Sequence, residues 1–194
     1  TMRLDVMGVA VFWSAGRFGW WQAWGTLGVM ALWIIVTAAV ILRTNPGLLA
    51  ERLGPRKGAK PWDTAIMSIV GLIQLARYIA AGLDQRYAWT ANIPTAAQLA
   101  ALAICVLGYA LVVWATASNT FFSQVVRIQT ERGHTVATGG PYRSLRHPGY
   151  FGAILYELAA PILLGSWPAL LISSISAALL LLRTALEDRT LLAE

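Results

Sequence analysis

The sequence is poor in charged residues. Lysine, arginine, aspartate and glutamate together make up only 12% of its 194 residues, whereas hydrophobic residues make up 57%. A soluble domain carries about 25% charged residues, so this composition argues strongly against a soluble globular enzyme. It also excludes a disordered chain, which combines low hydrophobicity with high charge. The single cysteine, Cys105, excludes a disulfide scaffold.

Long apolar stretches are what the sequence has instead. A membrane helix needs about 20 mostly apolar residues. Three stretches meet this requirement, at about residues 20–42, 62–83 and 95–117. Residues 2–15 are also apolar but shorter, and they fit either an interfacial helix or part of one more crossing.

A fourth apolar region covers residues 149–182 and is interrupted at residues 165–168. We interpret it as a helical hairpin of two short spans. The sequence therefore predicts an all-α, polytopic membrane bundle of about five transmembrane helices, in a single domain over residues 1–194. Residues 1–117 would supply the N-terminal spans, and residues 118–194 a loop, the hairpin and a C-terminal polar motif.

The basic residues are unevenly distributed among the connections. Most of the 15 lysines and arginines fall in the connections that would share one side of the membrane. The positive-inside rule makes that side cytoplasmic. We expect a multi-pass protein of a bacterial inner membrane that contacts lipid and no nucleic acid.

Polar side chains concentrate where the fourth apolar region begins. Pro148 is suited to the first position of a helix, which places His147 close to its N-cap. The unpaired N–H groups of a helix N-terminus favour anions, and the adjacent Arg146 adds a permanent cation. Upstream, Gly139 and Gly140 precede a proline and predict a turn.

Two further groups lie inside or beside the hairpin. Glu157 is a carboxylate within a membrane span, which is costly and marks either a functional residue or a bond to another helix, for example to Arg77. Arg183 and Glu187 are four residues apart and share a helix face. Alone, they also fit a juxtamembrane salt bridge.

The hairpin should bring its two ends together on the cytoplasmic side. The residues expected to converge there are Arg146, His147, Tyr150, Arg183 and Glu187. Cations, a carboxylate and aromatic faces suit a zwitterionic cofactor that carries adenine. Two histidines without a supporting ligand pattern argue against a metal site.

At these residues the sequence resembles the isoprenylcysteine carboxyl methyltransferase family, within the membrane phospholipid and isoprenylcysteine methyltransferase superfamily. The resemblance lies in residues 133–152 (GHTVATGGPYRSLRHPGYFG), in residues 164–167 (LGSW) and in residues 183–192 (RTALEDRTLL). Two positions depart from the family pattern: Arg127 stands where a glutamine is frequent, and Asp188 where a second glutamate is frequent. The family continues past this motif, so we expect the chain to be truncated at its C-terminus.

The resemblance implies a methyltransferase that uses S-adenosylmethionine, gives S-adenosylhomocysteine and methylates a lipophilic acceptor. Prenylcysteine, an isoprenoid or a phospholipid would be the acceptor, and a small thiol stays open as an alternative. Arg183 and Glu187 would be catalytic, and Arg183 would bind the substrate. Glu157 is a second candidate for substrate binding because of its position inside a membrane span, independently of the resemblance. The cofactor would be bound by His134, Thr135, Val136, Ala137, Tyr142, Arg146, His147, Pro148, Gly149, Tyr150 and Glu187.

Two alternatives stay open from the sequence. A membrane reductase of the sterol-reductase type also carries an Arg-His-Pro-x-Tyr-Phe-Gly string and uses NADPH. A membrane interaction subunit without enzymatic activity could retain a degenerate pocket.

Overall fold

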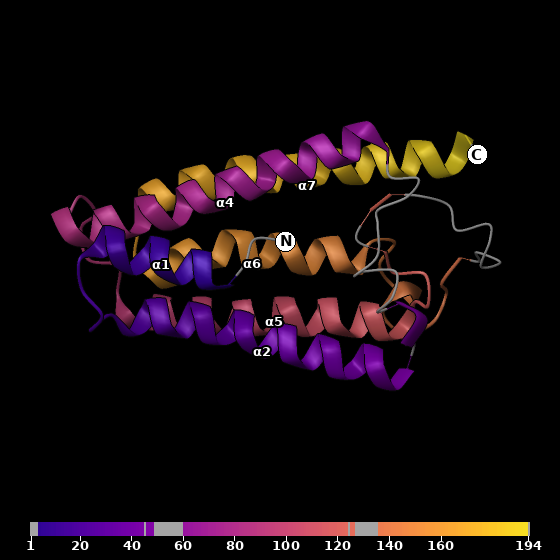
Figure 1. Ribbon diagram of the computed structural model, residues 1–194, viewed down its shortest axis with the longest axis horizontal. Helices are drawn as coiled ribbons and strands as arrows, with labels where there is room; N and C mark the ends of the chain where they lie inside the picture. Colours follow the sequence, from indigo (N-terminus) through magenta and orange to yellow (C-terminus); the bar gives the residue numbers. More distant parts are fainter. Residues whose placement is uncertain (1–3, 45, 49–59, 124, 127–135, 194) are drawn as a thin grey trace.

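The structure is a computed structural model, which describes residues 4–44, 46–48, 60–123, 125–126 and 136–193 (Figure 1). The regular structure of these residues is helical. The helices are α1 (Leu4–Ala15), α2 (Trp21–Thr44), α4 (Pro61–Tyr87), α5 (Thr95–Ser118), the short 3-10 helix η2 (Gly140–Arg143), α6 (Pro148–Leu164) and α7 (Trp167–Ala193). The all-α prediction is therefore confirmed.

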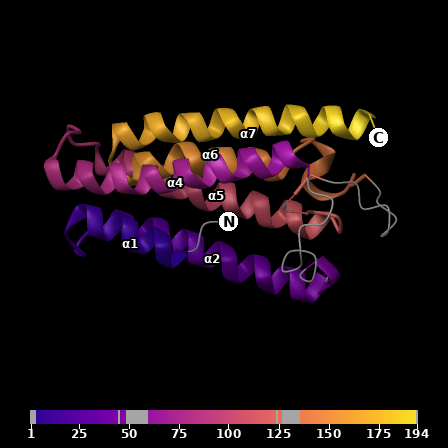
Figure 2. The ribbon, with the colours of Figure 1, turned by 45° about the horizontal axis from the view of Figure 1, so that its top comes forward.

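Among the described residues, four helices are long and apolar enough to cross a membrane: α2, α4, α5 and α7. Helix α6 has 17 residues and α1 has 12, so both are shorter apolar helices. The long helices lie roughly side by side along the long axis of the molecule, with α6 among them (Figures 1 and 2). The predicted polytopic helical bundle is confirmed, but the described residues form four helices of spanning length where about five were expected, because α6 is too short.

Proline and glycine set the boundaries of the predicted hairpin. Pro148 occupies the first turn of α6, with His147 as the N-cap residue, as expected. Gly165 ends α6 in the left-handed conformation at φ 76°, which glycine adopts without steric cost. The second limb is longer than expected, because α7 continues through the polar residues to Ala193.

Helices α5 and α6 pack tightly against each other. A Cβ atom on Gly152 would lie 2.3 Å from the carbonyl oxygen of Gly108, so only a residue without a side chain fits there. Helix α4 in turn packs on α7 and α1. These contacts bring α4, α6 and α7, which are far apart in the sequence, into one bundle.

A buried ion pair holds α4 against α6 in the middle of the bundle. Arg77 Nη1 donates to Glu157 Oε2 over 2.9 Å, and Gln74 Nε2 donates to Glu157 Oε1 over 2.8 Å. Arg77 and Glu157 are 1% and 3% exposed. Of the two sequence interpretations of Glu157, this geometry favours the bond to another helix, because both carboxylate oxygens are engaged by α4.

The ends of the helices that carry the polar motifs share one end of the bundle. The last turns of α2, α5 and α7 lie there with the first turns of α4 and α6 (Figure 1). The hairpin of α6 and α7 thus brings its two polar ends together, and the start of α4 joins them.

Candidate functional site

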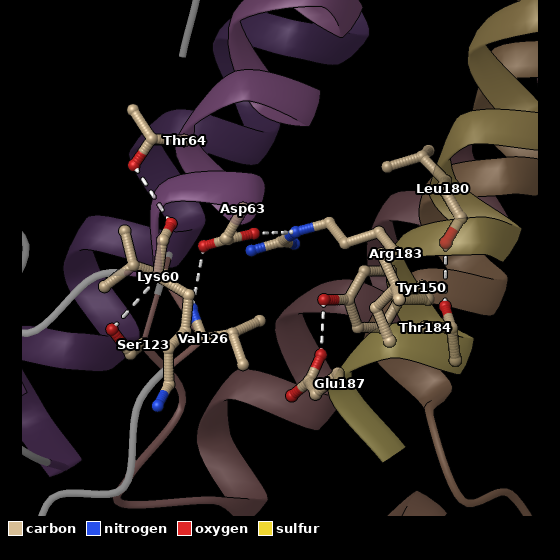
Figure 3. Close-up of polar contacts among 12 residues, drawn as sticks. Lys60, Asp63, Thr64, Ser123, Val126, Tyr150, Leu180, Arg183, Thr184 and Glu187 are labelled. Atoms are coloured by element: carbon tan, nitrogen blue, oxygen red, sulfur yellow. Dashed lines mark hydrogen bonds and ion pairs between the residues drawn. The ribbon is translucent and has the colours of Figure 1, made fainter. Parts of the chain in front are cut away.

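Arg183 is the central cation of the site. It lies on α7 and is 8% exposed. Its Nε donates to Oδ1 of Asp63, in the first turn of α4, over 2.6 Å (Figure 3). The Asp63 side chain is fully buried, and its Oδ2 accepts a 2.8 Å hydrogen bond from the backbone N–H of Val126. A buried charge needs such a partner, so this pair makes a cation possible in an apolar bundle.

Tyr150 joins the start of α6 to the last turns of α7. Its ring lies 5.1 Å from the guanidinium carbon of Arg183, which is within the range of a cation–π contact. Its hydroxyl donates to Glu187 Oε2 over 2.5 Å (Figure 3). Arg183, Tyr150 and Glu187 therefore form one connected cluster, as the predicted hairpin requires.

A second contact between the same two helices lies beside this cluster. His147 Nε2 is 2.8 Å from Asp188 Oδ1. Arg146 Nη1 is 3.8 Å from Asp188 Oδ2, and the Arg146 side chain is 80% exposed. Asp188, which the sequence marks as a departure from the family pattern, thus contacts the histidine at the start of α6.

Pro148 and Gly149 are buried at the start of α6. A Cβ atom on Gly149 would lie 2.6 Å from the Phe122 ring, so the glycine lets the chain that follows α5 pack against this helix end. In this structure Pro148 and Gly149 shape the site through backbone geometry. Their assigned role as cofactor-binding residues stays a prediction.

Tyr142 lies in η2, where the sequence predicts a turn. Gly140 has φ 57°, a left-handed conformation that favours glycine. Asn119 Nδ2 donates to the Tyr142 hydroxyl over 3.4 Å. Burial, with the nearby negative charge of Glu187, raises the pKa of Tyr142 above its ordinary value, so the phenol is neutral at physiological pH.

The remaining predicted cofactor residues precede η2. His134 and Thr135 lie outside the described residues. Val136 is exposed and Ala137 is half-buried, both outside regular secondary structure. Glu157 lies apart from this cluster, in the buried ion pair described above.

Asp63 is the residue that the sequence analysis missed. It is an isolated carboxylate at the end of an apolar span, next to a connection rich in arginine and lysine. The predicted topology places it on the same side of the membrane as Arg183, which was a usable signal. Its partner, however, is 120 residues away along the chain.

The arrangement can hold an anion and orient it. The Arg183 guanidinium offers hydrogen-bond donors in a fixed planar geometry, suited to a carboxylate. Glu187 and Asp188 offer oxygen acceptors for hydroxyl or amino groups. Within the described stretches no group of three or more histidine, cysteine, aspartate or glutamate residues could hold a metal ion.

Residues 100–193 match the family model described as the Isoprenylcysteine carboxyl methyltransferase (ICMT) family. The match includes η2, α6 and α7 and stops short of α4, which carries Asp63. No curated protein matches the chain. The family resemblance predicted from the motifs is confirmed by this match.

Proposed function

We propose that the protein is a membrane enzyme that transfers a methyl group from S-adenosylmethionine to the carboxylate of a lipophilic acceptor. The match of residues 100–193 to the ICMT family model supports this proposal. The active site would face the cytoplasm, the side that the positive-inside rule gives to the polar end of the bundle. The observation that carries the proposal is the position of Arg183. Its buried guanidinium lies against the Tyr150 ring, next to Glu187.

The donor set fits the cofactor. S-adenosylmethionine would supply an activated methyl group on a positively charged sulfur. Glu187 and Asp188 are half-buried carboxylates that can accept hydrogen bonds from its ribose hydroxyls or amino group. Arg146 is exposed and can pair with its carboxylate, while Tyr142 and Tyr150 offer aromatic faces for adenine.

Arg183 would position the acceptor. Its planar donors can hold a carboxylate so that one oxygen points at the methyl carbon. An ionised carboxylate is already nucleophilic, so this chain needs no general base for the reaction. Correct approach and exclusion of water are then the main contributions of the protein.

The surface next to Arg183 suits an acceptor with an apolar chain. Leu181 and Leu182 directly precede Arg183 and are 59% and 49% exposed on α7. An apolar tail lying along this surface in the bilayer would place a terminal carboxylate near the buried guanidinium. The soluble cofactor would enter from the aqueous end of the bundle.

The test is methyl transfer with a matched pair of acceptors. Membranes containing the protein are incubated with methyl-labelled S-adenosylmethionine and either a prenylated cysteine with a free carboxylate or its carboxamide. We expect label only in the carboxylate compound, in a form that base hydrolyses to methanol. Label in a base-stable amine or thioether would assign another acceptor.

Ligand binding to the same protein distinguishes a methyltransferase from the reductase alternative. S-adenosylhomocysteine should raise the melting temperature of the detergent-solubilised protein, because a ligand that binds the folded state stabilises it. NADPH should not. Stabilisation by NADPH alone would replace methyl transfer with a reductase, and stabilisation by neither ligand would favour an interaction subunit.

A further inference from the structure

Asp63 contacts Arg183 from a helix outside the family-matched segment. We infer that Asp63 is a positioning residue of the acceptor site, which orients the guanidinium of Arg183 for the acceptor carboxylate. The inference rests on the proposed function, because it assigns Asp63 a part in acceptor binding. It adds a residue of α4 to a site otherwise built from the hairpin of α6 and α7.

The hydrogen bond to Asp63 holds the Arg183 guanidinium at its Nε edge. Asp63 Oδ1 accepts from Nε of Arg183, which lies on the side-chain edge of the planar group. Asp63 Oδ2 accepts from the backbone N–H of Val126, so both oxygens are engaged and the carboxylate cannot rotate freely. An arginine held at Nε and packed on the Tyr150 ring has its plane defined from two directions.

Burial makes this contact strong. The side chains of Arg183 and Asp63 are 10% and 0% exposed, so water screens the pair little. Removing one member of a buried pair leaves an uncompensated charge. A surface carboxylate could not hold the arginine in this way, since exposed ion pairs contribute little.

Orientation of the acceptor is where such a contact would affect the rate. A displacement of about 1 Å in a positioning group can lower turnover by about 100-fold. The cofactor contacts proposed for Glu187, Asp188 and Arg146 lie on α7 and in the chain before α6. Loss of Asp63 should therefore impair use of the acceptor more than binding of S-adenosylhomocysteine.

Asp63→Asn is the direct test. Arg183 Nε–H and Val126 N–H reach different oxygens of Asp63, and asparagine replaces one of these oxygens with an NH2 donor, so one of the two hydrogen bonds is lost. We expect kcat/KM for the prenylcysteine acceptor to fall by about tenfold or more, with an unchanged Kd for S-adenosylhomocysteine. Asp63→Glu, which keeps the charge, should recover part of the activity.

Asp84→Asn is the matched control. Asp84 is also a buried aspartate of α4, is 3% exposed, and accepts from the backbone N–H of Thr90 over 2.7 Å. It lies in the last turns of the helix, at the other end of the bundle from the site. In Asp84→Asn, kcat/KM for the acceptor should not fall relative to the affinity for S-adenosylhomocysteine, so the ratio of the two should be that of the wild type.

A double variant shows whether Asp63 acts through Arg183. Asp63→Asn/Arg183→Gln removes both charges together and avoids a lone buried ion, so it is also the variant to use if Asp63→Asn does not fold. Its kcat/KM for the acceptor should equal that of Arg183→Gln alone. If kcat/KM of the double variant instead falls by the product of the losses in the two single variants, the residues act independently and the inference is overturned.

Other results are equally decisive. Wild-type kcat/KM in a folded Asp63→Asn enzyme would overturn the inference while leaving the proposed function intact. Equal losses in acceptor use and in S-adenosylhomocysteine binding would make Asp63 a general structural residue. A wild-type protein that methylates no acceptor would refute the proposed function, and this inference with it.

Discussion

The hydroxyl of Tyr150 donates a 2.5 Å hydrogen bond to Glu187, and this bond connects the first turn of α6 to the last turns of α7. The two residues are 37 positions apart and come from the two motifs that define the family resemblance. The Tyr150 ring also packs against Arg183. Tyr150 therefore contacts both Glu187, which is proposed to bind the cofactor, and Arg183, which is proposed to bind the acceptor.

Tyr150→Phe should separate these two contacts, because phenylalanine keeps the ring and removes the hydroxyl. Glu187 then loses its donor, and a hydrogen bond to a charged group contributes about 1.5–3 kcal/mol. We expect S-adenosylhomocysteine to bind about tenfold or more weakly by titration calorimetry, since about 1.4 kcal/mol corresponds to a factor of ten. Tyr87→Phe, at an exposed tyrosine of α4, is the control. Unchanged affinity in Tyr150→Phe would remove Glu187 from the cofactor site as proposed.

The buried pair of Arg77 and Glu157 should determine stability. Loss of one partner from a buried pair costs about 3–5 kcal/mol. Arg77→Met and Glu157→Gln should each lower the free energy of unfolding by this order. Arg77→Met/Glu157→Leu should recover much of the loss, because it leaves no unpaired ion. The free energy of unfolding of each variant can be measured by reversible unfolding in mixed micelles.

The same variants test the sequence-based role of Glu157. A double variant whose loss equals the sum of the two single losses would show that the residues act independently. A raised KM for the acceptor in Glu157→Gln, with little change in stability, would instead support the substrate-binding role.

Short-range signals predicted the fold well. Pro148 and Gly165 gave the limits of α6, because proline and glycine restrict the backbone locally. The convergence of Tyr150 with Glu187 followed from the hairpin, which needs no knowledge of the other helices. The length of α7 was underestimated because hydropathy falls at Arg183, whereas the helix continues through residues of high helix propensity.

Contacts between distant helices could not be predicted in the same way. The sequence does not define how α4 is aligned with α7, so the contact between Asp63 and Arg183 could not be predicted from it. For Glu157 the sequence offered Arg77 as one alternative, and only the packing of α4 on α6 favours it. Rotation of each helix about its own axis is the missing quantity, and tertiary packing sets it.

Arg146 should contribute to cofactor affinity and little to stability. Its side chain is 80% exposed and 3.8 Å from Asp188, and exposed pairs of this kind add little to folding. Arg146→Ala should leave the melting temperature unchanged, weaken binding of S-adenosylhomocysteine and reduce its salt dependence. Arg143→Ala, at an exposed arginine that ends η2 three residues earlier, is the matched control. Equal effects of the two substitutions would indicate general surface charge and refute a specific contact.

The contact of Gly152 with Gly108 should be intolerant of even one methyl group. A Cβ atom on Gly152 would lie 2.3 Å from the backbone oxygen of Gly108, so α5 and α6 would have to separate. We expect Gly152→Ala to destabilise the protein by about 1–3 kcal/mol, the usual cost of overpacking. Gly71→Ala is the control, because a Cβ atom on that residue of α4 has nothing within 4 Å. In a helix interior that substitution should stabilise by about 0.5–1 kcal/mol. Unfolding in mixed micelles should thus shift in opposite directions for the two variants, and a shift in the same direction would contradict the tight α5–α6 packing.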